Sequence, residues 1–239
     1  MDTKTRNLIA YFAGWMGPAF IVFYTIFWVI MGHNFPPPKF LAMSSQELVN
    51  DYYLKYNMQI RIGMTATLVA GFFYLIWGVQ VATMLRDSEG KLTFFSYLEL
   101  AGALLSGWVL GACPARWLAC AHYAGSMHPD LIMLLHSQTW FEYDMTYMIT
   151  MMQTTALALW IILNKKQTIF PLWVGWTTLA AGASFVTLSL IPFIPDGALS
   201  VGGVWNFFFV YGAWFILFFT IFSFYVLKEL RRRLIANEE

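Results

Sequence analysis

Charged residues are scarce in this chain. Aspartate, glutamate, lysine and arginine make up only 11% of the 239 residues, whereas a typical soluble domain carries roughly 25%. So few charges disfavour a water-soluble globule. The net charge of +1 gives no basic footprint for nucleic acid. Disorder is excluded because 59% of the residues are hydrophobic and 19% are aromatic. The class that remains is a polytopic membrane protein.

Motifs of known chemistry are also lacking. The chain has no P-loop, no G-x-G-x-x-G, no G-x-S-x-G and no H-E-x-x-H zinc pattern. No catalytic residue is therefore predicted, and a role without catalysis is favoured while the question of an enzyme stays open. No cofactor follows from a motif either.

Long apolar runs are what the chain has in abundance. A helix needs about 20 mostly apolar residues to cross the hydrocarbon. The runs are continuous rather than alternating, which predicts helices instead of a membrane barrel. The expected fold is an all-α bundle in one integral membrane domain, residues 1–239. Its six transmembrane helices are predicted at 8–31, 58–84, 94–112, 143–163, 172–192 and 204–227.

Lysine and arginine predict the orientation, because cytoplasmic loops carry an excess of both. With the N-terminus in the cytoplasm, ten of the 14 lie on the inner side and four on the outer side. With six spans, both termini are then predicted to lie in the cytoplasm. The membrane in question is expected to be the inner (plasma) membrane of the cell. The 231–233 arginine run is expected to contact anionic lipid headgroups.

Two outer loops are predicted to contain short interfacial helices. In the first, the proline run 36–38 forms a rigid extended turn, and Ser44 with Glu47 has the spacing of a capping box. An amphipathic helix should follow and lead into the second span. In the second outer loop, 113–142, Pro129 suits the first turn of a helix over 130–140.

Ionisable and amide side chains within the spans are the best clue to a site, because a charge at depth is costly unless it is paired or functional. Glu99 and Gln80 lie at similar depth near the inner ends of their spans, so a hydrogen bond between them is predicted. Gln153 lies near mid-membrane in the fourth span. These side chains either hold helices together or line a ligand cavity.

The outer mouth of that cavity is predicted from three charged residues. Arg61 opens the second span, while Glu142 and Asp144 open the fourth. An ion pair between Arg61 and a carboxylate would pin the two spans together, or would act as a polar gate.

Histidine and methionine suggest an alternative, an outward-facing copper or haem site. Imidazole and thioether groups are ligands of such metals. The candidates are His122, His128 and His136, together with Met145 and Met148. The competing interpretation is that histidines collect at the wet interface and that methionines fill gaps between helices.

The two cysteines and a glycine motif bear on packing. Cys113 and Cys120 can form a disulfide only if Pro114 breaks the helix between them, since a continuous helix holds them about 10 Å apart. Gly107 and Gly111 form G-x-x-x-G, which favours close helix packing within the chain or in a homo-oligomer.

Several segments together resemble a functionally uncharacterised family of bacterial polytopic inner-membrane proteins. The resemblance implies a role with apolar small molecules, and it assigns no catalytic residue. The chain departs from the family pattern at Ser137, where an aspartate is expected, and it lacks Pro-Phe-Ala before Trp205. The matching segments are Pro36-Pro37-Pro38, Ser45-x-Glu47, Asn57-x-x-Ile60-Arg61-x-Gly63, His128-Pro129-Asp130-Leu131-Ile132 to Trp140, Phe170-Pro171-x-Trp173-x-Gly175-Trp176 and Gly203-Val204-Trp205-Asn206.

The leading functional prediction is binding or transport of a small apolar or amphipathic molecule in a cavity lined by the second, fourth and fifth spans. The alternatives are a non-catalytic subunit of a larger membrane complex and a metal- or haem-binding protein. Expected partners are membrane lipids, a small hydrophobic ligand, and either a second copy or another membrane subunit. Nucleic acid is not expected.

Overall fold

The computed structural model describes residues 2–165, 168–212 and 214–236. Its regular elements are all helical, so the predicted all-α class is confirmed, and within these ranges no strand forms. The elements are α1 (Thr3–Tyr24), η1 (Thr25–Met31), η2 (Phe40–Ala42), α2 (Ser45–Glu47), η3 (Leu48–Leu54), α3 (Asn57–Ala82), α4 (Phe94–Tyr123), α5 (Pro129–Met145), α6 (Tyr147–Leu163), α7 (Leu172–Ser184), η4 (Phe185–Phe193), η5 (Val204–Tyr211), η6 (Trp214–Ile221) and α8 (Phe222–Ala236).

Five helical segments are long and apolar enough to cross a membrane, which is the property expected of a membrane protein. The sixth predicted span, 204–227, includes residue 213, which lies outside the described residues, so a sixth crossing stays a prediction. The five segments are Thr3–Met31, Asn57–Ala82, Phe94–Tyr123, Pro129–Leu163 and Leu172–Phe193.

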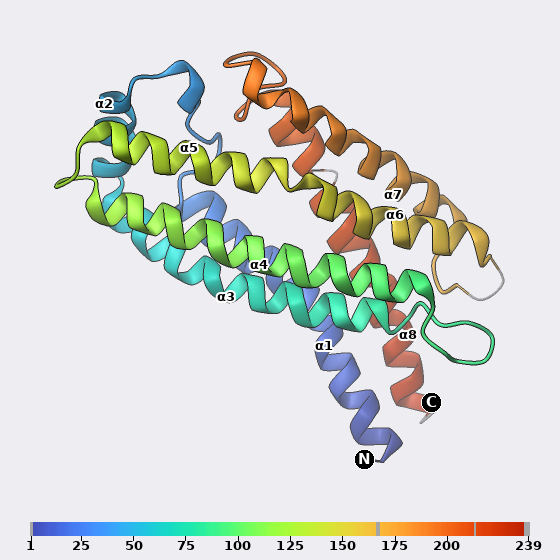
Figure 1. Cartoon of the computed structure of the whole chain (residues 1–239). Coiled ribbons are helices and arrows are strands. Elements are labelled where there is room, and N and C mark those ends of the chain that lie inside the picture. The colour runs from blue at the N-terminus through green and yellow to red at the C-terminus, as the bar shows by residue number, and fades with distance from the viewer. Residues whose placement is uncertain (1, 166–167, 213, 237–239) are drawn as a thin grey trace.

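The long helices form one elongated bundle (Figure 1). Helix α4 packs between α3 and α6, and α7 packs on the other side of α6. Helices α5 and α6 follow one another along almost the same line. Helix α1 packs against α3 and α8, so the two chain ends lie at the same end of the bundle, here called the termini end.

Small residues let α3 and α4 approach closely. A Cβ atom added at Gly78 would collide with the side chain of Ala103, and one added at Gly71 would lie 3.2 Å from the carbonyl oxygen of Gly107. The first glycine of the G-x-x-x-G motif therefore packs within the chain, against α3. At Gly111, no described atom lies within 4 Å of an added Cβ atom.

Helices α4 and α5 are longer than predicted, and this corrects the second outer loop. Helix α4 continues to Tyr123 instead of ending at residue 112, and α5 begins at Pro129, so residues 124–128 alone connect them. Helix α4 has 30 residues and is about 45 Å long, which exceeds the roughly 30 Å thickness of the hydrocarbon layer. Pro129 occupies the first turn as expected. The predicted short helix is thus the start of a helical segment that runs to Leu163.

The same helix shows that the possible disulfide between Cys113 and Cys120 does not form. Pro114 lies inside α4 without breaking it, because a proline removes only one backbone donor and neighbouring packing can hold the helix together. Cys113 and Cys120 are both buried and both free. A separation of seven residues along a continuous helix leaves the thiols too far apart to bond.

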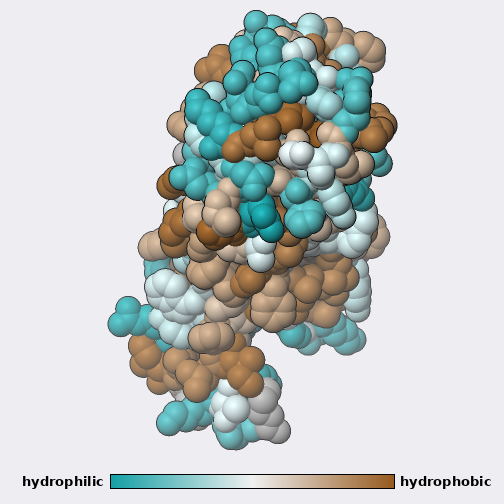
Figure 2. All heavy atoms as spheres, turned by 90° about the vertical axis from the view of Figure 1, so that its left-hand side faces the viewer, coloured by the Kyte–Doolittle hydropathy of each residue, from teal (hydrophilic) through white to brown (hydrophobic). Residues whose placement is uncertain are grey.

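The segment between η1 and α3 lies at the opposite end of the bundle, here called the loop end. The proline run is not helical, and the capping box is present: Ser44 Oγ accepts from the Glu47 amide at 3.2 Å, and Glu47 Oε2 accepts from the Ser44 amide at 2.7 Å. Figure 2 views the molecule from the left-hand side of Figure 1. On this side, hydrophilic atoms gather towards the top, and a mostly hydrophobic surface lies below them.

Candidate functional site

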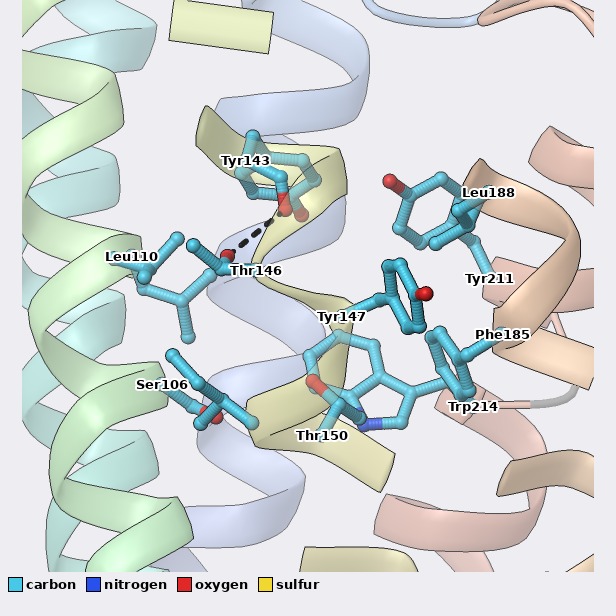
Figure 3. A pocket seen from close by; sticks show the side chains of 12 residues that line it. Ser106, Leu110, Tyr143, Thr146, Tyr147, Thr150, Phe185, Leu188, Tyr211 and Trp214 are labelled. Carbon is cyan, nitrogen blue, oxygen red and sulfur yellow. Dashed lines mark hydrogen bonds between the residues drawn. The ribbon is translucent and has the colours of Figure 1, made fainter. Parts of the chain in front are cut away.

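A small cavity, here called the central cavity, lies among α4, the α5–α6 junction, η4, η5 and η6. Its volume is about 40 Å³. A water molecule needs roughly 10–15 Å³ of such space, so the cavity has room for about three waters. Figure 3 shows Ser106 and Leu110 of α4 on one side of it and Phe185 and Leu188 of η4 on the other. Six lining side chains carry hydroxyl groups: Ser106, Tyr143, Thr146, Tyr147, Thr150 and Tyr211.

The junction between α5 and α6 places several of these side chains. Thr146 has φ −80° and ψ 11°, which interrupts the α-helix between Met145 and Tyr147. Its hydroxyl donates to the carbonyl oxygens of Glu142 at 2.8 Å and Tyr143 at 3.3 Å, and the second bond is drawn in Figure 3. The side chain thus satisfies backbone acceptors where the regular helical pattern is lost.

A second, larger cavity adjoins the first. It lies between the first helical segment and η5, with a volume of about 290 Å³, and its lining is mostly aromatic and aliphatic. Phe35 and Phe208 line it and are 60% and 48% exposed, so this side cavity opens at the surface of the bundle. Tyr143 and Tyr211 line both cavities and form the wall between them.

Both wall tyrosines are held by their hydroxyl groups. The Tyr143 hydroxyl lies 2.5 Å from that of Tyr24 on α1. The Tyr211 hydroxyl donates to Asp144 Oδ1. Asp144 is 1% exposed, and its Oδ2 has no hydrogen-bond partner among the described residues. The wall therefore ties together three segments of the chain around a buried carboxyl group.

The ion pair predicted for the gate involves a different arginine in the structure. Glu142 forms its ion pair with Arg116 of α4, and the side chains are 21% and 30% exposed, respectively. Arg61 instead lines an open groove between α3 and α4, together with Met58 and His122. The reason is the length of α4, which brings Arg116 alongside α5, while Arg61 faces the groove on the other side of α4.

The predicted bond between Glu99 and Gln80 is also wrong. Glu99 Oε1 accepts from Gln153 Nε2 at 2.8 Å, and Gln153 Oε1 accepts from the Tyr74 hydroxyl at 2.5 Å. These three side chains are fully buried and join α4, α6 and α3. Gln80 donates to the Thr83 hydroxyl at 3.1 Å, nearer the termini end.

The cavity itself differs from the predicted one. The second span, α3, contributes no residue to the lining of the central cavity, whereas α4, the third, contributes three. Gln153 is not among the lining residues, because it points between α3 and α4. The predicted fourth and fifth spans do contribute, through the 143–150 segment and η4.

The predicted metal ligands lie in different environments. His136 is fully buried, and its Nδ1 lies 2.6 Å from the Tyr53 hydroxyl. His122 and His128 are exposed, and Met148 is 60% exposed. Across the residues that the structure describes, no three His, Cys, Asp or Glu side chains gather as a metal site. Met145 is half-buried. The copper or haem alternative stays a prediction.

Sequence reasoning missed the tyrosines. Tyr24, Tyr74, Tyr143 and Tyr211 hold the polar contacts of the bundle interior, yet the chain has 12 tyrosines and their positions carry no motif. The one available signal is chemical: when a tyrosine ring is buried in an apolar span, its hydroxyl group needs a hydrogen-bond partner. That signal identifies the residue type but not which helix supplies the partner.

At the loop end, an ion pair fastens the segment after η4 to the first loop. Lys39 Nζ lies 2.5 Å from Asp196 Oδ1. The hydrogen bond from Lys39, with a second from the Gly197 amide, lowers the pKa of the Asp196 carboxyl below its usual value. Burial raises the pKa of Tyr53 well above its usual value, so the hydroxyl beside His136 stays protonated.

Comparisons with known proteins give no independent guide to the function. No family model, no curated protein and no solved structure matches the chain. The resemblance to bacterial inner-membrane proteins therefore stays a prediction.

Proposed function

We propose that the protein binds a small apolar or amphipathic molecule that reaches the side cavity from the surrounding membrane. The observation that carries the proposal is the pair of adjoining cavities with a shared wall of Tyr143 and Tyr211. A molecule seated in the side cavity would place an apolar body against aromatic rings. A polar group on it would meet the hydroxyls of the wall.

Size and chemistry support this occupant. Ligand pockets are usually about 300–1,000 Å³, apolar, with a few polar groups that fix orientation. The side cavity, at about 290 Å³, lies at the lower limit of that range. The central cavity, at about 40 Å³, holds only water unless the wall moves. Binding in the side cavity is therefore the primary event, and passage inward would require Tyr211 to leave Asp144.

Filling the side cavity tests the proposal. Gly212 lines it, and no described atom lies within 4 Å of a Cβ atom built there, so Gly212→Leu should occupy the space without a clash. The probe is bromobenzene, an apolar quencher of tryptophan fluorescence, added to the protein in nanodiscs. Trp28 lines the cavity and reports occupancy. We expect a saturable component of quenching in the wild type and at least a tenfold weaker one in Gly212→Leu.

The matched control is Gly111→Leu, which adds the same side chain at another glycine with open space, on α4. Its saturable quenching should equal that of the wild type. Trp28→Phe should remove the signal without unfolding the protein. If quenching is linear with bromobenzene in the wild type, or equally saturable in Gly212→Leu, the side cavity is not the binding site and the proposal fails.

The two alternatives have less support. The G-x-x-x-G motif that suggested a partner subunit packs against Gly71 through Gly107, although Gly111 leaves part of the face open. For the metal or haem alternative, an elemental analysis and an absorption spectrum of gently purified protein are the direct measurements.

A further inference from the structure

A basic pocket lies at the termini end, apart from the two cavities above. It has a volume of about 570 Å³ and lies among α1, the end of α3, the turn that follows it and α8. Its charged lining residues are three arginines, Arg6, Arg86 and Arg233, which come from three separate segments of the chain. No acidic side chain belongs to the part of its lining that the structure describes.

Arg86 is an arginine of the pocket whose described hydrogen bonds go only to uncharged groups. Arg86 uses its Nε and Nη1 for the backbone carbonyls of Thr83 at 3.0 Å and Gly90 at 2.6 Å, which are neutral acceptors. Arg233 Nε bonds to Glu229 at 2.8 Å, but the same carboxylate also holds Arg232. Arg86 therefore keeps its positive charge beside neutral acceptors and is available to an anionic group.

The pocket is built from ordered groups. Asn7 and Gln80 line it and are 5% and 7% exposed. Gln80 donates to the Thr83 hydroxyl at 3.1 Å, and that hydroxyl donates back to the Gln80 carbonyl at 2.7 Å. Asp87 accepts from two amides of the next turn, which fixes the segment that presents Arg86.

An exposed apolar face of α1 borders this pocket. Ile9 and Ala10 of α1 line it, and Ile9 is 56% exposed, as is its neighbour Leu8 at 57%. Phe12, one turn further along α1, is 68% exposed. An apolar helix face therefore runs directly beside a basic pocket, which is the arrangement that suits a molecule with acyl chains and an anionic head.

We propose that this arginine pocket binds the phosphate group of an anionic phospholipid, with the acyl chains lying along α1. Guanidinium groups donate paired hydrogen bonds that match phosphate oxygens. Basic pockets between transmembrane helices bind such headgroups in other proteins. A soluble phosphate compound offers the same oxygens, so the test must separate the two sources.

The experiment is native mass spectrometry of the full chain in detergent, titrated with dioctanoyl phosphatidylglycerol. We expect phosphatidylcholine of the same chain length to bind at least tenfold more weakly, because it carries no net negative charge. Arg86→Gln should weaken phosphatidylglycerol binding about fivefold, and Arg86→Gln with Arg233→Gln about thirtyfold. Glycerol 3-phosphate, the soluble arm, should not displace the lipid at equal concentration.

The matched control is Arg231→Gln, which removes one charge from the same arginine run at an exposed residue outside the pocket. Its affinity should change by less than twofold. An equal loss in Arg231→Gln, or equal binding of both lipids, would show attraction by net charge alone and overturn the site. Displacement by glycerol 3-phosphate would overturn the lipid assignment. Arg86 is exposed, so its single variant decides the question even if the double variant unfolds.

Discussion

The buried hydrogen-bond chain Tyr74–Gln153–Glu99 should stabilise the packing of α3, α4 and α6. The most direct perturbation is Gln153→Met. Methionine keeps an unbranched chain of the same length, which matters because Gln153 packs against Gly102. A Cβ atom built at Gly102 would lie 2.7 Å from the Cβ of Gln153. The substitution therefore removes the amide and leaves the close helix contact in place.

The expected loss follows from the two bonds that disappear. Hydrogen bonds between transmembrane helices contribute about 0.6 kcal/mol on average and at most about 1.7 kcal/mol. Losing both predicts a decrease of about 1–3 kcal/mol in the free energy of unfolding. The upper part of that range is favoured, because Glu99 Oε2 already lacks a partner among the described residues and Oε1 would lose the bond from Gln153.

The assay is reversible unfolding in mixed micelles by SDS, read by tryptophan fluorescence. Gln138→Met on α5 is the control, because Gln138 is exposed and the same change there should cost almost nothing. A double-mutant cycle with Tyr74→Phe isolates the bond between Tyr74 and Gln153 and should give a coupling energy of about 0.5–1.5 kcal/mol. Equal stability of Gln153→Met and Gln138→Met, with zero coupling, would refute the reasoning.

Two further predictions concern packing and pH. Gly17→Ala should destabilise the protein by about 1–3 kcal/mol in the same assay, because the new methyl group would collide with the buried Trp77 ring, whereas Gly111→Ala should be neutral. The Asp196 carboxyl, whose pKa the Lys39 hydrogen bond lowers, should stabilise the loop end at neutral pH and lose this contribution as pH falls through its lowered pKa. Carboxyl NMR titration of Lys39→Met should show that pKa return towards its usual value; an unchanged titration would contradict the assignment.

The sequence predicts the helical class well, because continuous apolar runs have few other solutions in a bilayer. The prediction of helix ends fails where a helix continues beyond the apolar region. Arg116 and His122 are polar and follow Pro114, so hydropathy reads 113–142 as a loop. The backbone nevertheless stays helical to Tyr123, because a helix that emerges from the hydrocarbon gains polar partners without losing its own hydrogen bonds.

The site residues show a similar division. Glu99, Asp144 and Gln153 are buried polar groups, as their position in apolar spans predicts, and each has a hydrogen-bond partner. The partners could not be predicted, because they depend on the rotation of each helix about its axis and on the relative depth of two helices. A shift of one turn moves a side chain by about 5 Å, so hydropathy alone does not tell that Arg116 rather than Arg61 reaches Glu142.

The two cavities have walls of different regularity, and this bears on how a ligand would be accommodated. Helix α4 forms one wall of the central cavity as an unbroken 30-residue helix. The facing walls come from the interruption at Thr146, the 3₁₀ segment η4 and the π-helical segments η1, η5 and η6. Such departures from α geometry are uncommon and often mark functional sites.

Because π-helical segments are often found at functional sites, a change in cavity volume should come from η5 rather than from α4. Tyr211 lies on η5, and its hydroxyl bond to Asp144 is the contact that such a change must break. Tyr143 lies on α5 just before the interruption at Thr146, and its contact with Tyr24 crosses to α1. Both wall tyrosines therefore lie at departures from α-helical geometry, Tyr211 in a π-helical segment and Tyr143 three residues before the interruption at Thr146.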